Sequence, residues 1–426
     1  MQSVVAQPEL ETGSHERLAR RAWLMVWMCM IGNMCCSTTV VLGNTGVFIK
    51  PLGQAMHWGR GEVTFALSVA AVSMALANPF VGRMIDHFGV RPVLIASMVG
   101  YGAVTAAVPA LIALWGQLGL YLGFALIAGI GAGSNVIAYV RVLSGWFAGP
   151  MDGSRGLALG ISGAGLPLGG AIASPLAVKL IDVLGWRAGF WGLALLPICI
   201  GLPIAIFAIR MADGEGGGAR AARSDGRGAA PGLSLRGASR TRSFWLMIAV
   251  ALLMASCLQG IGIQTPPMLS DRGITANGLA LVLAATSVLG VAGRVGAGFL
   301  FDHFFAPRVS IAIFGTGAVA AFMLVGLPGL AAAVIASLLL TLGTGAESDF
   351  VGYLVGRYFG LRAYGEIFGW IYGMFMIGIA VGPFVFGLAF DYYGSYRIPF
   401  AFAGCGLSLI CLLLLMMPRF RAPATA

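Results

Sequence analysis

Residues Gly82–His87 read Gly-Arg-Met-Ile-Asp-His, and residues Gly298–His303 read Gly-Phe-Leu-Phe-Asp-His. The two stretches lie 216 residues apart, and each ends an apolar run of helical length. Glycine-rich matches in the fourth and fifth apolar runs of each half repeat at offsets of 212 and 209 residues. Because the three matches keep their order, and the first includes Asp and His as well as Gly, they predict a chain built of two related halves.

The composition around these motifs is that of a membrane protein. Of the 426 residues, 58% are hydrophobic and 10% are charged, and the mean hydropathy is +0.90. Soluble domains carry about 25% charged residues. A helix needs about 20 apolar residues to cross a bilayer, so the chain has room for twelve crossings. The apolar runs predict helices near 22–49, 62–84, 92–113, 117–145, 156–180, 187–210, 244–268, 276–300, 309–328, 331–356, 366–390 and 397–418.

The two predicted halves are joined by a segment of different composition. Residues 211–243 are rich in Gly, Ala, Ser and Arg, which is typical of a flexible linker. The predicted organisation is therefore a tail 1–21, a six-helix bundle 22–210, a linker 211–243, a second six-helix bundle 244–418 and a tail 419–426.

The basic residues predict how the chain is oriented. The net charge of +10 is scattered between apolar runs, so it does not indicate a nucleic-acid partner. With both termini inside, 19 of the 26 Lys and Arg fall on the cytoplasmic side, six fall outside and Arg294 lies within a helix. This bias is the usual one for cytoplasmic loops. The first apolar run is too long for a signal peptide. We expect a plasma-membrane protein (inner membrane in a bacterium) with both termini cytoplasmic.

Residues Gly82–Arg91 resemble the loop signature of the major facilitator superfamily, G-x-x-x-D-R-x-G-R-R, with His87 and Val90 as departures. The resemblance implies an all-α integral membrane fold of twelve helices in two pseudo-symmetric six-helix bundles. In that family the aspartate sits against the start of helix eleven and helps to latch one conformation, where exposed N–H groups favour a carboxylate. The latch or gate residues implied here are Gly82, Asp86, Gly89, Arg91, Asp302 and Glu366.

A pairing of Glu366 is also expected at this gate. Arg141, Arg357 and Arg362 lie near the cytoplasmic ends of predicted helices, where contact with lipid is the simpler interpretation. Glu366 is close enough in the predicted topology to pair with one of them.

Within the superfamily, Gly46–Pro51 followed by Trp58 and Glu62 resembles the monocarboxylate porter and oxalate/formate antiporter group. Members of that group carry an arginine in helix eight that binds the substrate carboxylate, and Arg294 matches it here. Gly43 stands where several animal members have a lysine, and helix eleven lacks the lysine of the oxalate exchanger, so the dianion oxalate is not expected. The resemblance implies a secondary transporter of a small organic anion, such as a monocarboxylate.

Arg294 is expected near the centre of the bilayer. It lies eight residues before Asp302, which is about 12 Å along a helix. A charge at this depth costs roughly 2.5–3.5 kcal/mol, and a guanidinium suits a carboxylate that accepts two hydrogen bonds. We predict that Arg294 binds substrate; the alternative is a structural ion pair with an acid on another helix.

Glu347 and Asp349, on the predicted helix ten, are the best partners for that arginine. Intramembrane carboxylates often mark proton pathways, so both are candidates for proton coupling. Residues two apart on a helix point about 200° away from each other, so only one can face a central cavity. The repeat aligns Glu347 with Asn135, which favours Glu347 as the substrate-facing acid and Asp349 as a packing residue or a partner of arginine.

Other polar residues within apolar runs are weaker candidates for substrate contact. Helices one, four, seven and ten line the cavity in the resembling family, which favours Asn44, Asn135 and Gln264. Tyr139, Tyr353 and Tyr372 are also polar groups in apolar helices, and packing hydrogen bonds explain each of these side chains equally well.

The motifs of other functional classes are missing from the sequence. The four histidines fall at helix ends or in the tail, the seven cysteines lack the spacing of a zinc site, and there is no HExxH, P-loop lysine or nucleophile elbow. We expect no enzyme activity, no cofactor and no metal. The expected partners are a small organic anion, protons and the lipid bilayer, and the protein is expected to work as a monomer. The alternatives are drug or metabolite efflux by the same fold and a transporter-like receptor or sensor.

Overall fold

The computed structural model describes residues 7–147, 153–209, 232–327 and 329–418. The first half contains α1 (Gln7–Met34), α2 (Ser37–Val40), η1 (Leu42–Asn44), α3 (Thr45–Met56), α4 (Arg60–Phe88), α5 (Val90–Trp115), α6 (Gln117–Gly131), η2 (Ala132–Ser134), α7 (Val136–Trp146), α8 (Arg155–Gly163), α9 (Gly165–Leu184), α10 (Trp186–Leu196), η4 (Pro197–Gly201) and η5 (Ile204–Ala208). The second half contains α12 (Leu235–Ser239), α13 (Arg242–Asp271), α14 (Ala276–His303), α15 (Ala306–Gly326), α16 (Leu330–Phe359), α17 (Tyr364–Tyr393) and α18 (Arg397–Leu415).

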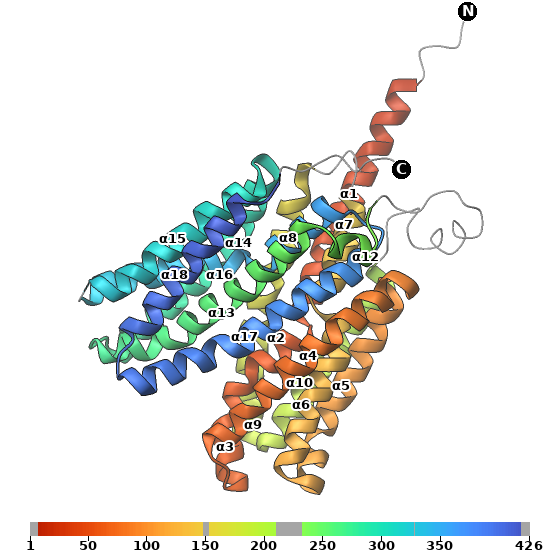
Figure 1. The fold of residues 1–426 in the computed structure, drawn as a ribbon. Helices are drawn as coiled ribbons and strands as arrows, with labels where there is room; N and C mark the ends of the chain where they lie inside the picture. The colour runs from red at the N-terminus through yellow and green to blue at the C-terminus, as the bar shows by residue number, and fades with distance from the viewer. Residues whose placement is uncertain (1–6, 148–152, 210–231, 328, 419–426) are drawn as a thin grey trace, which may run out of the picture.

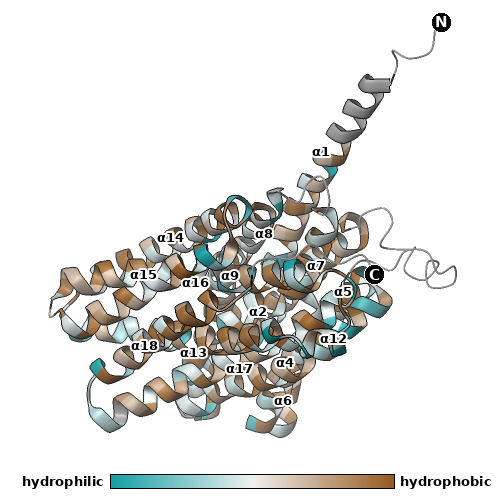
Figure 2. Cartoon of the chain, turned by 45° about the horizontal axis from the view of Figure 1, so that its top comes forward, coloured by the Kyte–Doolittle hydropathy of each residue, from teal (hydrophilic) through white to brown (hydrophobic). Residues whose placement is uncertain are grey.

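These elements make twelve spans, as predicted. Among the described residues, ten helices or continuous helix pairs are long and apolar enough to cross a membrane, and the bent pair Leu18–Met34 and Ser37–Met56 makes an eleventh. The twelfth is α16, whose apolar part is Leu330–Gly343. Many apolar side chains face outward; Leu118 and Phe207, for example, are 72% and 75% exposed. Figure 2 shows hydrophobic residues spread along the helices of both halves, and such a surface requires lipid around it.

The spans form two bundles, α1–α10 (the N-bundle) and α13–α18 (the C-bundle), which lean against each other in Figure 1. The N-bundle contacts the C-bundle through α4 against α17 and through α8 against α14. The linker helix α12 packs against α13 and α17 where α4 ends and α17 begins. We call this the linker end of the molecule, and we call the opposite one the far end.

Two spans that the sequence predicts as continuous are broken near their middle. The first bends by 42° between α1 and α2, and the fourth is interrupted at Asn135, whose backbone is extended. Backbone groups freed inside a membrane need partners from the protein. Here the two breaks supply them: the N–H of Ser37 donates to Ser134 Oγ (3.3 Å), and the N–H of Thr38 donates to Asn135 Oδ1 (3.4 Å).

The helices also extend beyond their predicted ends. The first helix starts at Gln7, inside the predicted tail 1–21, because Leu, Glu and Arg form helix well outside an apolar environment. Within the predicted linker 211–243 the structure has α12 and the start of α13 at Arg242. The rest of that segment, up to residue 231, and the predicted C-terminal tail 419–426 lie outside the described residues.

Candidate functional site

Arg294 lies on α14 at the boundary between the two bundles. Its side chain is buried, and its Nε lies 2.9 Å from Asp349 Oδ2 on α16. Its Nη1 donates a hydrogen bond of 2.6 Å to the carbonyl oxygen of Gly163 on α8. A buried guanidinium is tolerated only with such partners. Arg294 therefore joins an acid of its own bundle to the backbone of the other bundle.

Glu347 is also buried, and it contacts a different helix. Gln259 Nε2 on α13 donates to Glu347 Oε1 at 3.0 Å. Glu347 Oε2 has no hydrogen-bond partner among the described residues. The two acids thus face different neighbours, as expected for residues two apart on one helix, and Asp349 is the one that pairs with Arg294.

A cavity of about 370 Å³ extends from Arg294 toward the far end. It lies between α13, α14 and α16, with Pro167 of α9 on the N-bundle side. Its walls combine apolar and hydroxyl side chains, and Arg294 is the one charged residue among the described residues that line it. These side chains include Leu258, Ile261, Val282, Val291, Leu340, Thr265, Thr286, Ser287, Ser337 and Thr341.

Glu347, which the sequence analysis predicts to face substrate, is not among the described residues that line this cavity. The cavity-lining residue Leu340 lies seven residues earlier on α16, and positions seven apart share a helix face. Glu347 is therefore on the cavity side of α16, two turns nearer the linker end, and it is buried there.

Asn44 and Asn135 are held within the N-bundle and are not among the cavity-lining residues. The Nδ2 group of Asn44 donates to the carbonyls of Thr39 and Val40, and its Oδ1 accepts a hydrogen bond from Ser174. Asn135 Oδ1 accepts from the Ser37 and Thr38 side chains at 3.3 and 2.9 Å. In this conformation both amides stabilise the break in the first span. Their hydrogen bonds serve packing within the N-bundle and leave no direct contact with the cavity.

Gln264 is half-buried on α13 and does not line the cavity. The amide that reaches an acid is Gln259, which the sequence analysis did not select. Gln259 and Gln264 are both polar residues in the first apolar run of the second half. A polar residue within an apolar run therefore indicates either one equally well. The choice depends on how α13 is rotated in the bundle, which a single sequence does not specify.

The linker end is sealed by two equivalent carboxylates. Asp86, near the end of α4, accepts hydrogen bonds from the N–H groups of Gly365 (2.9 Å) and Glu366 (2.8 Å) at the start of α17. Asp302, near the end of α14, accepts hydrogen bonds from the N–H groups of Gly156 (2.6 Å) and Leu157 (2.8 Å) at the start of α8. Each carboxylate caps the positive end of a helix in the other bundle.

The helices at both seals are in backbone contact through glycine. A Cβ on Gly82 would collide with the carbonyl oxygen of Gly365, and a Cβ on Gly156 would collide with that of Gly298. Only glycine allows helices to approach this closely. Two other predicted latch residues, Gly89 and Arg91, shape the turn that follows α4: Gly89 ends the helix with φ of +87°, and Arg91 donates to the carbonyl of Ile206.

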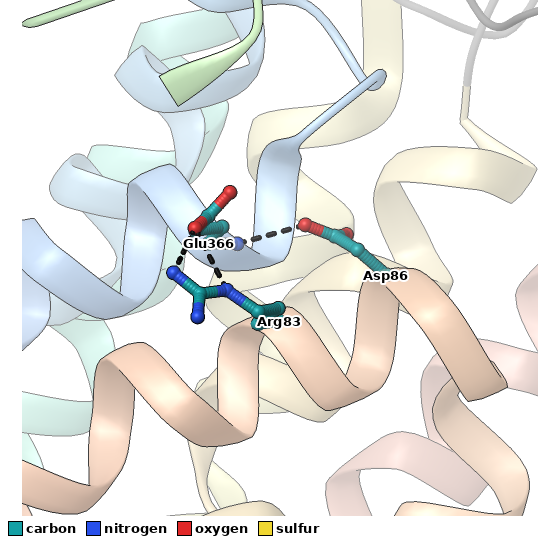
Figure 3. Close-up of polar contacts among 3 residues, drawn as sticks. All are labelled: Arg83, Asp86 and Glu366. Carbon is teal, nitrogen blue, oxygen red and sulfur yellow. Dashed lines mark hydrogen bonds and ion pairs between the residues drawn. The ribbon is translucent and has the colours of Figure 1, made fainter. Parts of the chain in front are cut away.

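Glu366 pairs with Arg83, as Figure 3 shows, an arginine that the sequence analysis did not select. Arg83 Nε and Nη2 donate to Glu366 Oε1 at 3.0 and 2.7 Å. Arg83 belongs to the same motif as Asp86 and lies one turn earlier on α4. The motif could therefore have been used to predict Arg83 as the partner of Glu366. Because Arg83 is 63% exposed, the pair adds little to stability.

A further arginine at the linker end was not selected from the sequence. Arg155, the first residue of α8, is buried and donates to Ser144 Oγ at 2.7 Å. Its guanidinium lies 6.0 Å from the ring centre of Tyr353 on α16. A Cβ on Gly356 would collide with the same guanidinium. The charged end of Arg155, a residue of the N-bundle, thus packs against α16 of the C-bundle, where Gly356 leaves room for it.

Comparisons with known proteins agree with this architecture. The sequence model of the family described as Major Facilitator Superfamily matches residues 23–352. The chain is 24% identical over 388 residues to a gentisate transporter of Corynebacterium glutamicum, which covers 86% of this chain and 82% of the relative. It is 26% identical over 425 residues to a probable sulfoacetate transporter of Cupriavidus necator, which covers 92% and 93%. It is 29% identical over 146 residues to monocarboxylate transporter 3 of Gallus gallus, which covers 34% and 25%.

Solved structures share the fold at low identity. The fucose:proton symporter of E. coli superposes with a TM-score of 0.68 at 15% identity, over 93% of this chain and 98% of that one. A proton:xylose symporter gives 0.70 at 13%, over 94% and 97%. The human organic anion transporter MFSD10 gives 0.64 at 17%, over 93% and 99%. All the proteins named in these matches are membrane transporters.

Proposed function

Since the chain belongs to the Major Facilitator Superfamily and is a transporter rather than an enzyme, we propose that it carries a small organic monocarboxylate across the membrane by alternating access. The observation that supports this most is Arg294, the one charged side chain among the described residues of the cavity wall. A neutral cargo would not require a cation at this depth, where its insertion is costly. A dicarboxylate would leave its second charge against apolar walls.

The relatives support an organic anion as the cargo, the broader class to which monocarboxylates belong. Gentisate and sulfoacetate, in the names of the two relatives that match most of the chain, are organic anions. The cavity itself adds apolar walls and hydroxyl groups around Arg294. We therefore assign the carboxylate of the cargo to Arg294 and its carbon body to the walls formed by α13, α14 and α16.

The geometry supports alternating access with the linker end closed. Asp86 and Asp302 cap helices of the opposite bundle at that end, and the cavity lies on the far-end side of Arg294. The excess of Lys and Arg at the linker end favours a cytoplasmic location for it. We propose that the cavity faces the outside of the plasma membrane in this state and that a single chain is the working unit.

We assign the coupling proton to Asp349. A carboxylate that binds Arg294 competes with Asp349 for the same guanidinium. An acid left buried and unpaired is unstable while it carries a charge, and protonation removes that charge. Binding of the anion and of a proton would then favour each other, which is the requirement for symport.

The test is uptake of radiolabelled acids into proteoliposomes, over a panel of monocarboxylates and dicarboxylates, with and without a proton gradient. We expect monocarboxylate uptake by the wild type and its loss in Arg294→Ala. Arg308→Ala, which removes an exposed arginine at the start of α15, is the control. Transport of neutral compounds alone, or equal rates in Arg294→Ala and wild type, would reject the proposal.

A further inference from the structure

A second, smaller pocket opens at the far end of the C-bundle, and we call it the far-end pocket. It has a volume of about 250 Å³ and lies where α13 ends, where α18 begins and where α15 turns into α16. Its lining residues are two arginines and four uncharged residues: Arg272, Arg397, Val325, Leu327, Gly329 and Leu330. No acid lines it among the residues that the structure describes. The far-end pocket therefore holds two positive charges that no lining residue balances.

A contact between α13 and α18 brings the two arginines to the same pocket. The hydroxyl of Tyr396 donates to Asp271 Oδ2 at 2.8 Å. Arg272 and Arg397 are the residues that directly follow these two in the sequence. One hydrogen bond between the end of α13 and the start of α18 thus places two like charges side by side on the pocket wall.

The two arginines differ in how the protein itself satisfies them. Arg272 is half-buried; its Nη2 donates to the carbonyl of Leu324 at 2.7 Å, and its Nη1 donates to those of Leu327 and Gly329 at 3.3 and 3.5 Å. These carbonyls lie at the negative end of α15. A guanidinium has five N–H donors, so at least two remain for a ligand.

Arg397 is exposed, and its side chain has no hydrogen bond or ion pair with any residue that the structure describes. It is also the first residue of α18, whose first turn contains no acid. A positive charge is unfavourable at the N-terminal end of a helix. An anion from outside the chain would therefore stabilise Arg397 here.

The surroundings place the far-end pocket at the level of the lipid headgroups. Tyr392 and Tyr393, at the end of α17, are both exposed and lie a few residues before Arg397 in the sequence. Exposed tyrosines gather at the interface between membrane and water. Arginine is also disfavoured on the outer side of a membrane, so two of them in one pocket at this end require an explanation.

The apolar part of the wall favours a lipid over a free anion. Leu327 and Leu330 line the pocket and are exposed. Five residues deeper in the membrane, α15 exposes Phe322 and α18 exposes Phe402, and these two helices pack against each other. A free anion has no use for an apolar rim that continues into the hydrocarbon. A phospholipid has a phosphate for the arginines and acyl chains for this surface.

We propose that the far-end pocket binds the phosphate group of a phospholipid in the leaflet at the far end. Arg397 and the remaining donors of Arg272 bind the phosphate oxygens, which suit a guanidinium, and the acyl chains run along α15 and α18. Basic pockets between transmembrane helices bind lipid headgroups in this way. The bound lipid joins the ends of α13, α15 and α18, and α13 is also a wall of the central cavity. The inference is independent of the identity of the cargo.

The internal repeat supplies a matched control. Arg187 lies at the start of α10 as Arg397 lies at the start of α18, each directly after an aromatic residue, at an offset of 210 residues. Arg187 is exposed at the same end of the molecule, but its guanidinium lies 5.5 Å from the ring centre of Trp186, and it does not line the far-end pocket.

The test is native mass spectrometry of the purified full-length protein titrated with dioleoylphosphatidylglycerol, which resolves each bound lipid. We expect Arg397→Gln to weaken one binding step about fivefold, the factor typical of one basic residue at an anionic membrane surface. Arg187→Gln should leave every step unchanged. Dioleoylglycerol, which has the same chains and no phosphate, should bind wild type and Arg397→Gln equally. Because the side chain of Arg397 has no partner among the described residues, its replacement removes no contact of the fold.

Thermal unfolding separates a lipid from a free anion. Inorganic phosphate should stabilise the wild type no more than Arg397→Gln. Stabilisation by phosphate that depends on Arg397, with lipid binding equal in both proteins, would make this a site for a free anion and overturn the proposal. Identical lipid binding by Arg397→Gln and wild type at every step, or an equal loss in Arg187→Gln, would overturn it as well.

Discussion

Asp86 of the N-bundle accepts a hydrogen bond from the backbone N–H of Gly365 in the C-bundle, with 2.9 Å between oxygen and nitrogen. Asp302 makes the equivalent bond to Gly156 in the reverse direction, from the C-bundle to the N-bundle, at 2.6 Å. The repeated motif of the sequence has thus become a pair of reciprocal helix caps. Both caps hold the same end of the molecule closed.

Removal of the Asp86 cap should open the linker end. In Asp86→Ala the first turn of α17 loses two acceptors, and a lost cap costs about 1 kcal/mol, enough to change the ratio of conformations about fivefold. We expect faster labelling by a thiol reagent of a cysteine introduced at Val140, which is buried where α7 meets Gly352 of α16. Asp182→Ala, which removes an exposed aspartate of α9, should leave the labelling rate unchanged. Unchanged labelling in Asp86→Ala would contradict the latch.

The glycine contacts predict a sharp difference between two neighbouring positions on α14. A Cβ on Gly298 would collide with the backbone of Gly156, whereas a Cβ on Gly296 meets nothing within 4 Å. Gly298→Ala should force α8 and α14 apart and reduce transport at least tenfold. Gly296→Ala should transport normally and gain up to about 1 kcal/mol from helix propensity. Initial uptake rates and thermal unfolding of both purified variants would measure this, and equal rates would exclude the contact as a seal.

The assignment of the proton to Asp349 predicts different pH dependences for two neighbouring acids. In Asp349→Asn, anion binding no longer leaves a charged acid unpaired, so uptake should become insensitive to external pH. Glu347→Gln keeps a side chain that accepts from Gln259 and should retain the pH dependence. The measurement is initial uptake at several external pH values. Loss of the dependence in Glu347→Gln, with its retention in Asp349→Asn, would transfer the role to Glu347.

The exposed pair of Arg83 and Glu366 should matter much less than the caps. Exposed ion pairs contribute about 0–1 kcal/mol. We expect Arg83→Gln to change the initial uptake rate by less than about twofold. Added salt should change the wild-type rate by less than about twofold as well. A loss of transport comparable to that of Asp86→Ala would make the pair part of the latch.

The architecture could be predicted from the sequence because it is repeated there. The number of apolar residues and the matched motifs at Asp86 and Asp302 implied twelve helices in two related bundles. The family match and the fold confirm this. Eight residues of helical rise placed Arg294 at depth, at a level where the structure has a cavity. These inferences depend on local spacing along one helix, which a single sequence contains.

What the sequence did not predict depends on how helices meet. The breaks at Ser37 and Asn135 satisfy each other across two spans, so neither is visible in its own apolar run. Glu347 shares a face of α16 with the cavity-lining Leu340, but its burial away from the cavity depends on how the helices pack.

The central claim is that Arg294 binds the carboxylate of the cargo, and equilibrium binding to purified protein tests it most directly. A labelled monocarboxylate and its neutral amide would be titrated against wild type, Arg294→Ala and the control Arg308→Ala. A hydrogen bond to a charged group is worth about 1.5–3 kcal/mol, so Arg294→Ala should weaken binding of the acid about 10- to 100-fold, while the control binds normally and the amide binds to none. Equal affinity of Arg294→Ala and wild type for the acid, or tight binding of the amide, would contradict the claim.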